Sequence, residues 1–264
     1  MTFKSSATTH VGMVRKVNQD SYAERSDIGV WAVADGMGGH EAGEIASATV
    51  TDFIKNLPAN DNIESMLSAV EESIMAANLQ LTQQAAAYDS QRVPGSTVVA
   101  LIINGNRGAI VWAGDSRIYR RRDQAITQLT RDHSHVQDLV EQGVILESEA
   151  ESHPMANVIT RAVGISDPLE LDSQWIDVRS DDQFLLCSDG LSRLVTNEEL
   201  ASMMANKDNE EVTQSLLHTA LVRGARDNVT LICVKNGNEA DDALPAEEST
   251  IIQDSNPLDD FDFD

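Results

Sequence analysis

Two apolar, β-branched runs separated by a short turn signal constrain the fold of this chain more than any other feature. The runs are Ser96–Ile103 and Gly108–Ala113, and Asn104-Gly105-Asn106 lies between them. Asn and Gly favour tight hairpin turns, so the two runs are predicted to be neighbouring antiparallel strands. A second hairpin is predicted from Tyr119–Arg121 and Ala125–Leu129. The chain is therefore expected to contain antiparallel sheet rather than parallel βαβ units.

The other periodic segments also come in groups and do not alternate regularly. Apolar residues recur at the helical period in some segments, whereas short continuous apolar runs mark buried strands. The expected helices lie at 42–57, 63–81 and 209–223, and the further strands at 29–34, 169–178, 182–188 and 229–234. Grouped antiparallel strands with separate helices favour a layered α+β domain.

The charge balance excludes two classes of partner. The 264 residues carry a formal net charge of -24. Nucleic-acid binding needs a basic face and anionic membranes attract basic segments, so neither partner is expected. The longest purely apolar run, Val98–Ile103, is far shorter than the ~18 residues that span a bilayer. The first ten residues hold no apolar signal-peptide core. We expect a cytoplasmic monomer.

The two cysteines are expected to be structural. Cys187 and Cys233 each lie within an apolar run, FLLC and LICV. Buried thiols in a reducing compartment are favoured over a disulfide or a metal site.

The C-terminal segment differs in composition from the rest. Residues 236–264 hold ten acidic residues and no Lys or Arg. This composition, without apolar periodicity, predicts a disordered acidic tail after a folded domain at 1–235. Within the tail, Ser249 and Thr250 follow two glutamates and precede two isoleucines. Either residue is a hypothetical phosphosite, or this stretch is a docking segment.

Four aspartates occur at the ends of predicted strands. Three of them follow an apolar run and adjoin a glycine, in Asp35-Gly36, Gly114-Asp115 and Asp189-Gly190, while Asp227 precedes the last apolar run. Antiparallel pairing places the start of one strand beside the end of its neighbour, so all four could converge. Converging carboxylates need a counter-charge, and hard oxygen ligands suit Mg²⁺ or Mn²⁺. Each acid taken alone equally fits a turn or a helix N-cap.

An ordered set of motifs accompanies these aspartates. The motifs are Arg15-Lys16-Val17-Asn18-Gln19-Asp20, Asp35-Gly36-Met37-Gly38-Gly39-His40, Gly95-Ser96-Thr97, Gly114-Asp115-Ser116-Arg117, Ser188-Asp189-Gly190 and Asp227-Asn228. Together they resemble the metal-dependent Ser/Thr protein phosphatases, the PPM or type 2C family, in their bacterial form. The resemblance covers roughly residues 5–235.

The resemblance implies a four-layer α-β-β-α sandwich of two antiparallel sheets, with a binuclear Mn²⁺ or Mg²⁺ centre at one end. Carried over by motif, Asp35 would bridge the two ions and the Gly36 carbonyl oxygen would be a ligand. Asp189 and Asp227 would hold the first ion. Asp20 would act on the second ion through water.

The resemblance also implies hydrolysis of phosphoserine and phosphothreonine in proteins, opposing a bacterial Ser/Thr kinase. Water activated by two ions would attack phosphorus, with Asp35 and Asp189 serving catalysis as ligands. Asp115, with Asp189, would hold a third ion. Arg15 would bind the phosphate through its planar fork of donors, although it could equally be a surface arginine.

The proton donor to the leaving group is not assigned. Eukaryotic relatives carry a histidine directly after the Asp-Gly pair, and this chain has Met37 there. His40 lies three residues further on and could support the site, cap a helix or donate the proton. Protonation by metal-bound water is the preferred hypothesis.

The segment at 130–164 matches the family's flap region, which is thought to influence substrate choice. It contains His133, His135 and His153, for which surface positions are favoured over a zinc site. Arg161 could stabilise the flap or contact substrate. The basic triplet at 120–122 is expected to be a solvated hairpin end, or else to meet acidic substrates or the tail.

Two other functions remain in competition with phosphoprotein hydrolysis. A catalytically silent family member would bind phosphoproteins, but such members should lack metal ligands. A two-metal nuclease or nucleotide phosphohydrolase would need a basic groove, which the charge disfavours.

Overall fold

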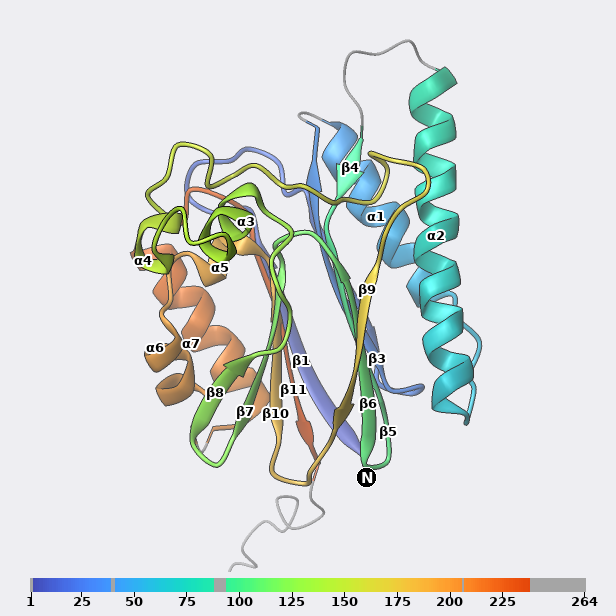
Figure 1. Cartoon of the computed structure of the whole chain (residues 1–264). Helices are drawn as coiled ribbons and strands as arrows, with labels where there is room; N and C mark the ends of the chain where they lie inside the picture. Colours follow the sequence, from blue (N-terminus) through green and yellow to red (C-terminus); the bar gives the residue numbers. More distant parts are fainter. Residues whose placement is uncertain (1, 39–40, 88–93, 206, 238–264) are drawn as a thin grey trace, which may run out of the picture.

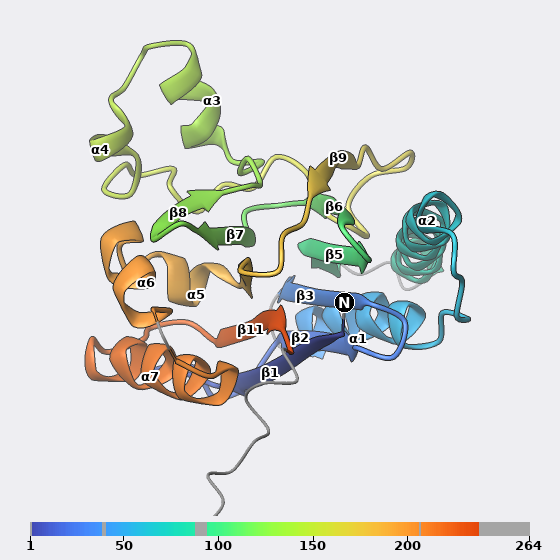
Figure 2. The ribbon, with the colours of Figure 1, turned by 90° about the horizontal axis from the view of Figure 1, so that it is seen from below.

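Two antiparallel sheets pack face to face and helices cover the outer side of each, as Figures 1 and 2 show. This computed structural model describes residues 2–38, 41–87, 94–205 and 207–237. The predicted α-β-β-α sandwich is therefore confirmed. Among the described helices, none has the length and apolar character needed to cross a membrane.

The first sheet has the strand order β1-β11-β10-β7-β8. Its strands are β1 (Phe3–His10), β11 (Val229–Asn236), β10 (Gln183–Cys187), β7 (Arg117–Arg122) and β8 (Ala125–Gln128). Helices α5 (Asp189–Ser192), α6 (Asn197–Met203) and α7 (Asn209–Val222) lie on the side of this sheet that faces away from the second sheet.

The second sheet has the order β2-β3-β5-β6-β9, with the two-residue strand β4 paired to the end of β3. Its strands are β2 (Asp20–Arg25), β3 (Val30–Met37), β4 (Gly95–Ser96), β5 (Val98–Asn104), β6 (Arg107–Ala113) and β9 (Asp172–Asp177). Helices α1 (Glu41–Lys55) and α2 (Ile63–Ala87) cover its outer face. The short helices α3 (His135–Glu141) and α4 (Glu147–Ala150) belong to the segment between β8 and β9.

Side chains alternate between core layers along the central strands. In β3, Trp31 and Val33 join the cluster between the sheets, whereas Ala32 and Ala34 join the cluster beneath α1 and α2. A third cluster lies beneath α5, α6 and α7. Both faces of the central strands are therefore buried, which explains why they read as continuous apolar runs.

The hairpin predictions are confirmed. Strands β5 and β6 pair from Val98↔Ala113 to Asn104↔Arg107, and β7 pairs with β8. The predicted helices are also present, while the edge strands β1 and β2 and the short helices α3 to α6 were not predicted. One boundary prediction was wrong: β3 continues to Met37, so Asp35 lies inside the strand and not past its end.

The prediction of a solvated basic triplet was also wrong. Arg122 binds both oxygens of the buried Asp182 at 2.6 Å and Asp177 at 2.7 Å. Arg120 lies 3.6 Å from Asp177, and Arg121 donates to the Ala201 carbonyl oxygen. These contacts fasten β7 to the end of β9, to the β9–β10 connection and to α6. The three guanidinium groups are therefore paired with protein groups.

Candidate functional site

Five aspartates from four parts of the chain converge at one end of the sandwich. Asp20 and Asp35 are direct register partners in the β2–β3 pair. Asp189 begins α5 immediately after β10, and Asp227 lies two residues before β11, which pairs with β10. Asp115 lies in the turn between β6 and β7 and is 5% exposed. The convergence expected from antiparallel pairing is thus what the fold produces.

Hydroxyl groups hold two of these aspartates in place. Ser188 Oγ donates to Asp20 Oδ2 at 2.8 Å. Thr97 Oγ1 accepts from the Asp35 N–H at 3.0 Å, and the Thr97 N–H donates to the Asp35 carbonyl oxygen at 2.9 Å. Ser116 Oγ lies 2.7 Å from Thr97 Oγ1. These supports come from motifs that the sequence singled out, although the role of each hydroxyl was not predicted.

The glycines beside the aspartates are required by close backbone approach. A Cβ on Gly36 would lie 2.0 Å from the Gly43 carbonyl oxygen. A Cβ on Gly190 would lie 1.9 Å from the Asn228 carbonyl oxygen. Only glycine fits at either position, so each Asp-Gly pair packs tightly against a neighbouring chain segment.

Asn228 organises the loop that carries Arg15. Its Oδ1 accepts from the Gln19 N–H at 2.8 Å, and its Nδ2 donates to the carbonyl oxygens of Val11 at 2.9 Å and Val17 at 3.1 Å. One side chain therefore fixes both ends of the loop between Val11 and Gln19. The sequence predicts its motif with Asp227, but this role depends on contacts between distant segments of the chain.

Burial and mutual repulsion disfavour ionisation of the carboxylates. Burial raises the pKa of both Asp20 and Asp115 to about 7. Burial, followed by repulsion from Asp20 and Asp189, raises the pKa of Asp35 well above its ordinary value. The pKa of Asp189 is also raised, mainly by burial. A positive charge supplied from outside the chain would favour the ionised form of all four.

Three of these carboxylates each have one oxygen without a partner. Asp20 Oδ1, Asp115 Oδ1 and Asp189 Oδ1 are buried and accept no hydrogen bond. Leaving a buried acceptor unsatisfied is costly, so such atoms mark places where a ligand belongs. A set of donor atoms that consists of carboxylate oxygens fits a hard divalent cation such as Mg²⁺ or Mn²⁺.

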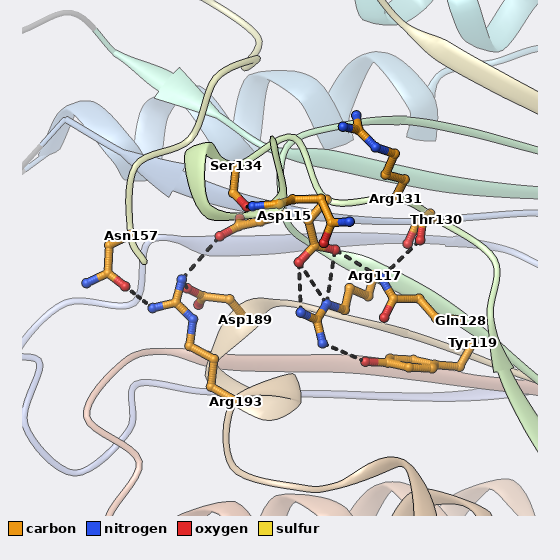
Figure 3. A network of polar contacts seen from close by, with 12 residues as sticks. Asp115, Arg117, Tyr119, Gln128, Thr130, Arg131, Ser134, Asn157, Asp189 and Arg193 are labelled. Atoms are coloured by element: carbon orange, nitrogen blue, oxygen red, sulfur yellow. Dashed lines mark hydrogen bonds and ion pairs between the residues drawn. The ribbon is translucent and has the colours of Figure 1, made fainter. Parts of the chain in front are cut away.

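Two arginines contact carboxylates of this group, as Figure 3 shows for Arg193. Arg193 Nη2 lies 2.9 Å from Asp189 Oδ2 and 3.2 Å from Asp115 Oδ2. Arg15 binds Asp227 in a bidentate manner at 2.8 and 3.0 Å. With these pairs formed, no three His, Cys, Asp or Glu side chains in the described part of the chain form a metal-binding cluster as they stand. Arginine thus supplies part of the counter-charge here.

Ion pairs fasten the segment at 130–164 to the sandwich. Asp132 is bound by Arg117 of β7 at 2.8 Å, and Arg161 donates to Asp172 of β9 at 2.8 Å. Arg193 reaches the same segment through Asn157. Of the two roles considered for Arg161, stabilising this segment is the one that its contact supports.

The prediction of a surface position was wrong for His133, which is 1% exposed. Its Nδ1 accepts from the Gly114 N–H, and its Nε2 lies 3.2 Å from Asp172 Oδ2. Its ring stacks on Trp112. His135 and His153 are partly exposed. Within the described residues these histidines form no metal cluster.

Several predicted residues add nothing to the described geometry. His40, Ser249 and Thr250 lie outside the described residues. Met37 ends β3, where it pairs with Gly95. Cys187 and Cys233 are buried free thiols, as predicted, and burial raises the pKa of each to about 12.

Comparison with known proteins identifies the family. The profile described as "Protein phosphatase 2C" matches residues 12–224. The chain is 34% identical over 232 residues to the serine/threonine protein phosphatase PstP of Mycobacterium tuberculosis, covering 88% of this chain and 45% of that protein. The chain therefore belongs to the protein phosphatase 2C family, and it spans about half the length of this mycobacterial relative.

Solved structures agree with this assignment. PppA of Pseudomonas aeruginosa superposes with a TM-score of 0.83 at 39% identity, covering 89% of this chain and 98% of PppA. The catalytic domain of a PstP, solved in complex with two manganese ions, gives a TM-score of 0.77 at 34% identity, covering 88% of this chain and 97% of that one.

Proposed function

We propose that this protein is a metal-dependent phosphatase that removes phosphate from phosphoserine and phosphothreonine in proteins. The observation that carries the proposal is the group of buried carboxylates with unpartnered oxygens beside Arg15. Membership in the protein phosphatase 2C family and the named activity of the mycobacterial relative support it.

The ligands would come from the converging aspartates. Asp35 would serve both ions, the Gly36 carbonyl oxygen would be a ligand, and Asp189 and Asp227 would hold the first ion. Asp20, whose Oδ1 is unpartnered, would act on the second ion through water. When bound, two Mn²⁺ or Mg²⁺ ions would activate the attacking water and offset charge on the phosphoryl group.

Arg15 would bind the phosphate of the substrate. Its side chain is 54% exposed, and its Nε and Nη2 already grip a carboxylate in parallel. The same pair of donors fits two phosphate oxygens. Cation binding by Asp227 would release Arg15 from its present partner and make those donors available.

A third ion would involve Asp115 and Asp189, each of which has one unpartnered oxygen. Arg193 now bridges the other oxygens of this pair. An ion there would compete with the guanidinium for negative charge, so this site should be weaker than the other two.

The physiological context is also part of the proposal. Phosphoproteins are the substrates, and a bacterial Ser/Thr kinase would supply them. Met37 has no proton to donate to the leaving oxygen, so solvent water in the site would deliver it. The segment at 130–164 would act as the flap of the phosphatase domain, residues 1–235.

One assay series tests the proposal. p-Nitrophenyl phosphate and a phosphothreonine peptide are incubated with Mn²⁺, with Mg²⁺ and with chelator. Turnover should require the metal and should fall by at least ~10³-fold in Asp35→Asn, since two-metal catalysis supplies several kcal/mol. Asp52→Asn, on the exposed face of α1, is the matched control. Turnover that survives chelation would overturn the mechanism, and binding of phosphopeptide without turnover would favour a silent family member.

A further inference from the structure

An arginine-rich cavity adjoins the proposed phosphate site. It has a volume of about 360 Å³, and its lining includes Arg15, Arg193, Arg223 and Arg226. Four of the chain's 19 basic residues thus surround one cavity, although the net charge is -24. A local excess of arginine in an acidic protein focuses positive potential on one place and attracts anions.

Three of the four arginines already have carboxylate partners. Arg15 pairs with Asp227, and Arg193 pairs with Asp115 and Asp189. Arg223 pairs with Glu199 of α6, and this contact lowers the pKa of that glutamate to about 2. Each of these guanidinium groups is at least partly neutralised by the protein itself.

Arg226 differs from the other three. It is exposed, and no hydrogen bond or ion pair joins its side chain to any residue in the described ranges. It directly precedes Asp227, so its backbone is fixed beside the phosphate site. All the donors of its guanidinium group therefore remain available in a cavity that Arg15 also lines.

We propose that Arg226 forms a subsite for a second anionic group of the substrate, beside the phosphorylated residue. The group would be a carboxylate of Asp or Glu, or a second phosphate, since both accept hydrogen bonds from guanidinium in parallel. Arg223 contributes positive charge to the same cavity. The inference rests on the proposed function, because the subsite shares its cavity with Arg15, Asp189 and Asp227.

The expected preference is moderate and depends on salt. A pair between an exposed guanidinium and a carboxylate changes affinity by roughly 2- to 5-fold. Added salt reduces this preference, because exposed charges are screened. A doubly charged phosphate should give the larger effect of the two anions.

The test compares phosphothreonine peptides that differ only in the residues flanking the phosphothreonine. The flanking residues are alanine, glutamate, lysine or a second phosphoserine, and the readout is the ratio of kcat/KM for each anionic peptide to that for the alanine peptide. The wild-type chain should prefer glutamate and phosphoserine. Arg226→Gln should bring both ratios close to one, and Arg226→Glu should shift preference to the lysine peptide.

Arg179→Gln provides the matched control. This arginine is 58% exposed and lies in the β9–β10 connection, at the other end of the sandwich (Figure 1). Its loss should leave the ratios unchanged. A wild-type chain without anionic preference, or a preference that survives in Arg226→Gln, would overturn the subsite.

Failure of the proposed function can be recognised separately. If no peptide is turned over with any metal, binding of fluorescently labelled versions of the same peptides is measured by anisotropy. Tighter binding of the anionic peptides that is lost in Arg226→Gln would retain the subsite and discard the phosphatase. Equal binding of all peptides would discard the subsite as well.

Discussion

Asp20 and Asp35 face each other across the β2–β3 pair, and neither forms an ion pair with a basic side chain in the described part of the chain. Burial is the main cause that raises the pKa of both carboxyl groups, and repulsion from Asp189 adds to it at each. Repulsion from Asp20 raises the pKa of Asp35 further. Antiparallel register alone brings them together, since each belongs to a different strand. Without a cation, the folded chain holds two opposed carboxylates whose charges are not compensated.

Replacing Asp35 with Asn should therefore stabilise the chain in chelator. The substitution removes a carboxyl group whose ionised form is disfavoured by burial and by repulsion from Asp20 and Asp189. Since one pKa unit corresponds to about 1.4 kcal/mol, we expect a gain of at least ~1 kcal/mol in the free energy of unfolding. The same substitution should remove most of the stabilisation that Mn²⁺ gives to the wild-type chain. Guanidinium unfolding curves with chelator and with Mn²⁺ measure both effects. No gain in chelator, together with unchanged stabilisation by Mn²⁺, would contradict a cation site at Asp35.

Gly190→Ala should distort the site even though it adds a single methyl group. The new Cβ would lie 1.9 Å from the Asn228 carbonyl oxygen, so Asp189 and Asn228 cannot both keep their positions. Asn228 also fixes the loop of Arg15, so phosphate binding should weaken together with metal binding. Isothermal titration with Mn²⁺ and phosphatase assays would measure the two losses.

Gly105→Asn is the matched control for this substitution. Gly105 has φ +62 in the β5–β6 turn and nothing lies near its Cβ position. Asn accepts such a conformation. The control should retain Mn²⁺ affinity and activity, and a Gly190→Ala protein that does the same would refute the steric argument.

The central strands could be predicted from the sequence, whereas the register that builds the site could not. β3 and β5 are buried on both faces and read as apolar runs, but the edge strands β1 and β2 are rich in polar residues. Because β2 was not predicted, its pairing of Asp20 with Asp35 could not be predicted either. The aspartates were identified through motif and glycine context, which is local information.

Contacts between distant segments were also beyond the sequence. The pairing of Arg15 with Asp227 joins residues that are 212 positions apart. The burial of His133 depends on the docking of its segment against β6 and β9. Exposure, ion-pair partners and loop anchors depend on such long-range packing, which local periodicity does not encode.

Arg117→Met should destabilise the chain strongly. Arg117 donates to both oxygens of Asp132 at 2.8 to 3.0 Å and to the Tyr119 hydroxyl at 3.1 Å. Removing one partner of such a pair leaves the largely buried Asp132 carboxylate without its cation, which costs about 3–5 kcal/mol. Chemical denaturation measures the loss. Combining Arg117→Met with Asp132→Leu should recover part of the stability. Purely additive losses would show that the two charges are not coupled.

Protonation of His133 should lower the stability of the chain below about pH 6.5. It opposes the gain in stability that the carboxyl groups with raised pKa, among them Asp20 and Asp115, contribute as the pH falls. Burial lowers the pKa of this histidine, although Asp172 partly opposes the shift. Its Nδ1 accepts a hydrogen bond from the Gly114 N–H, so a proton on Nδ1 would face another donor. The folded state therefore binds this proton less readily than the unfolded state. The contribution of His133 to stability is lost as the pH falls from the ordinary histidine pKa through the lowered one.

Denaturation midpoints at pH 7.5, 6.5 and 5.5 would measure this dependence for the wild-type chain, His133→Gln and His218→Gln. His133→Gln should cost stability at pH 7.5, since it loses the buried ring, but the difference from the wild-type chain should become smaller toward pH 5.5. His218 is exposed on α7, so its variant should follow the wild-type curve. Parallel curves for all three proteins would exclude His133 as a source of acid sensitivity, because the fixed cost of losing the ring does not change with pH.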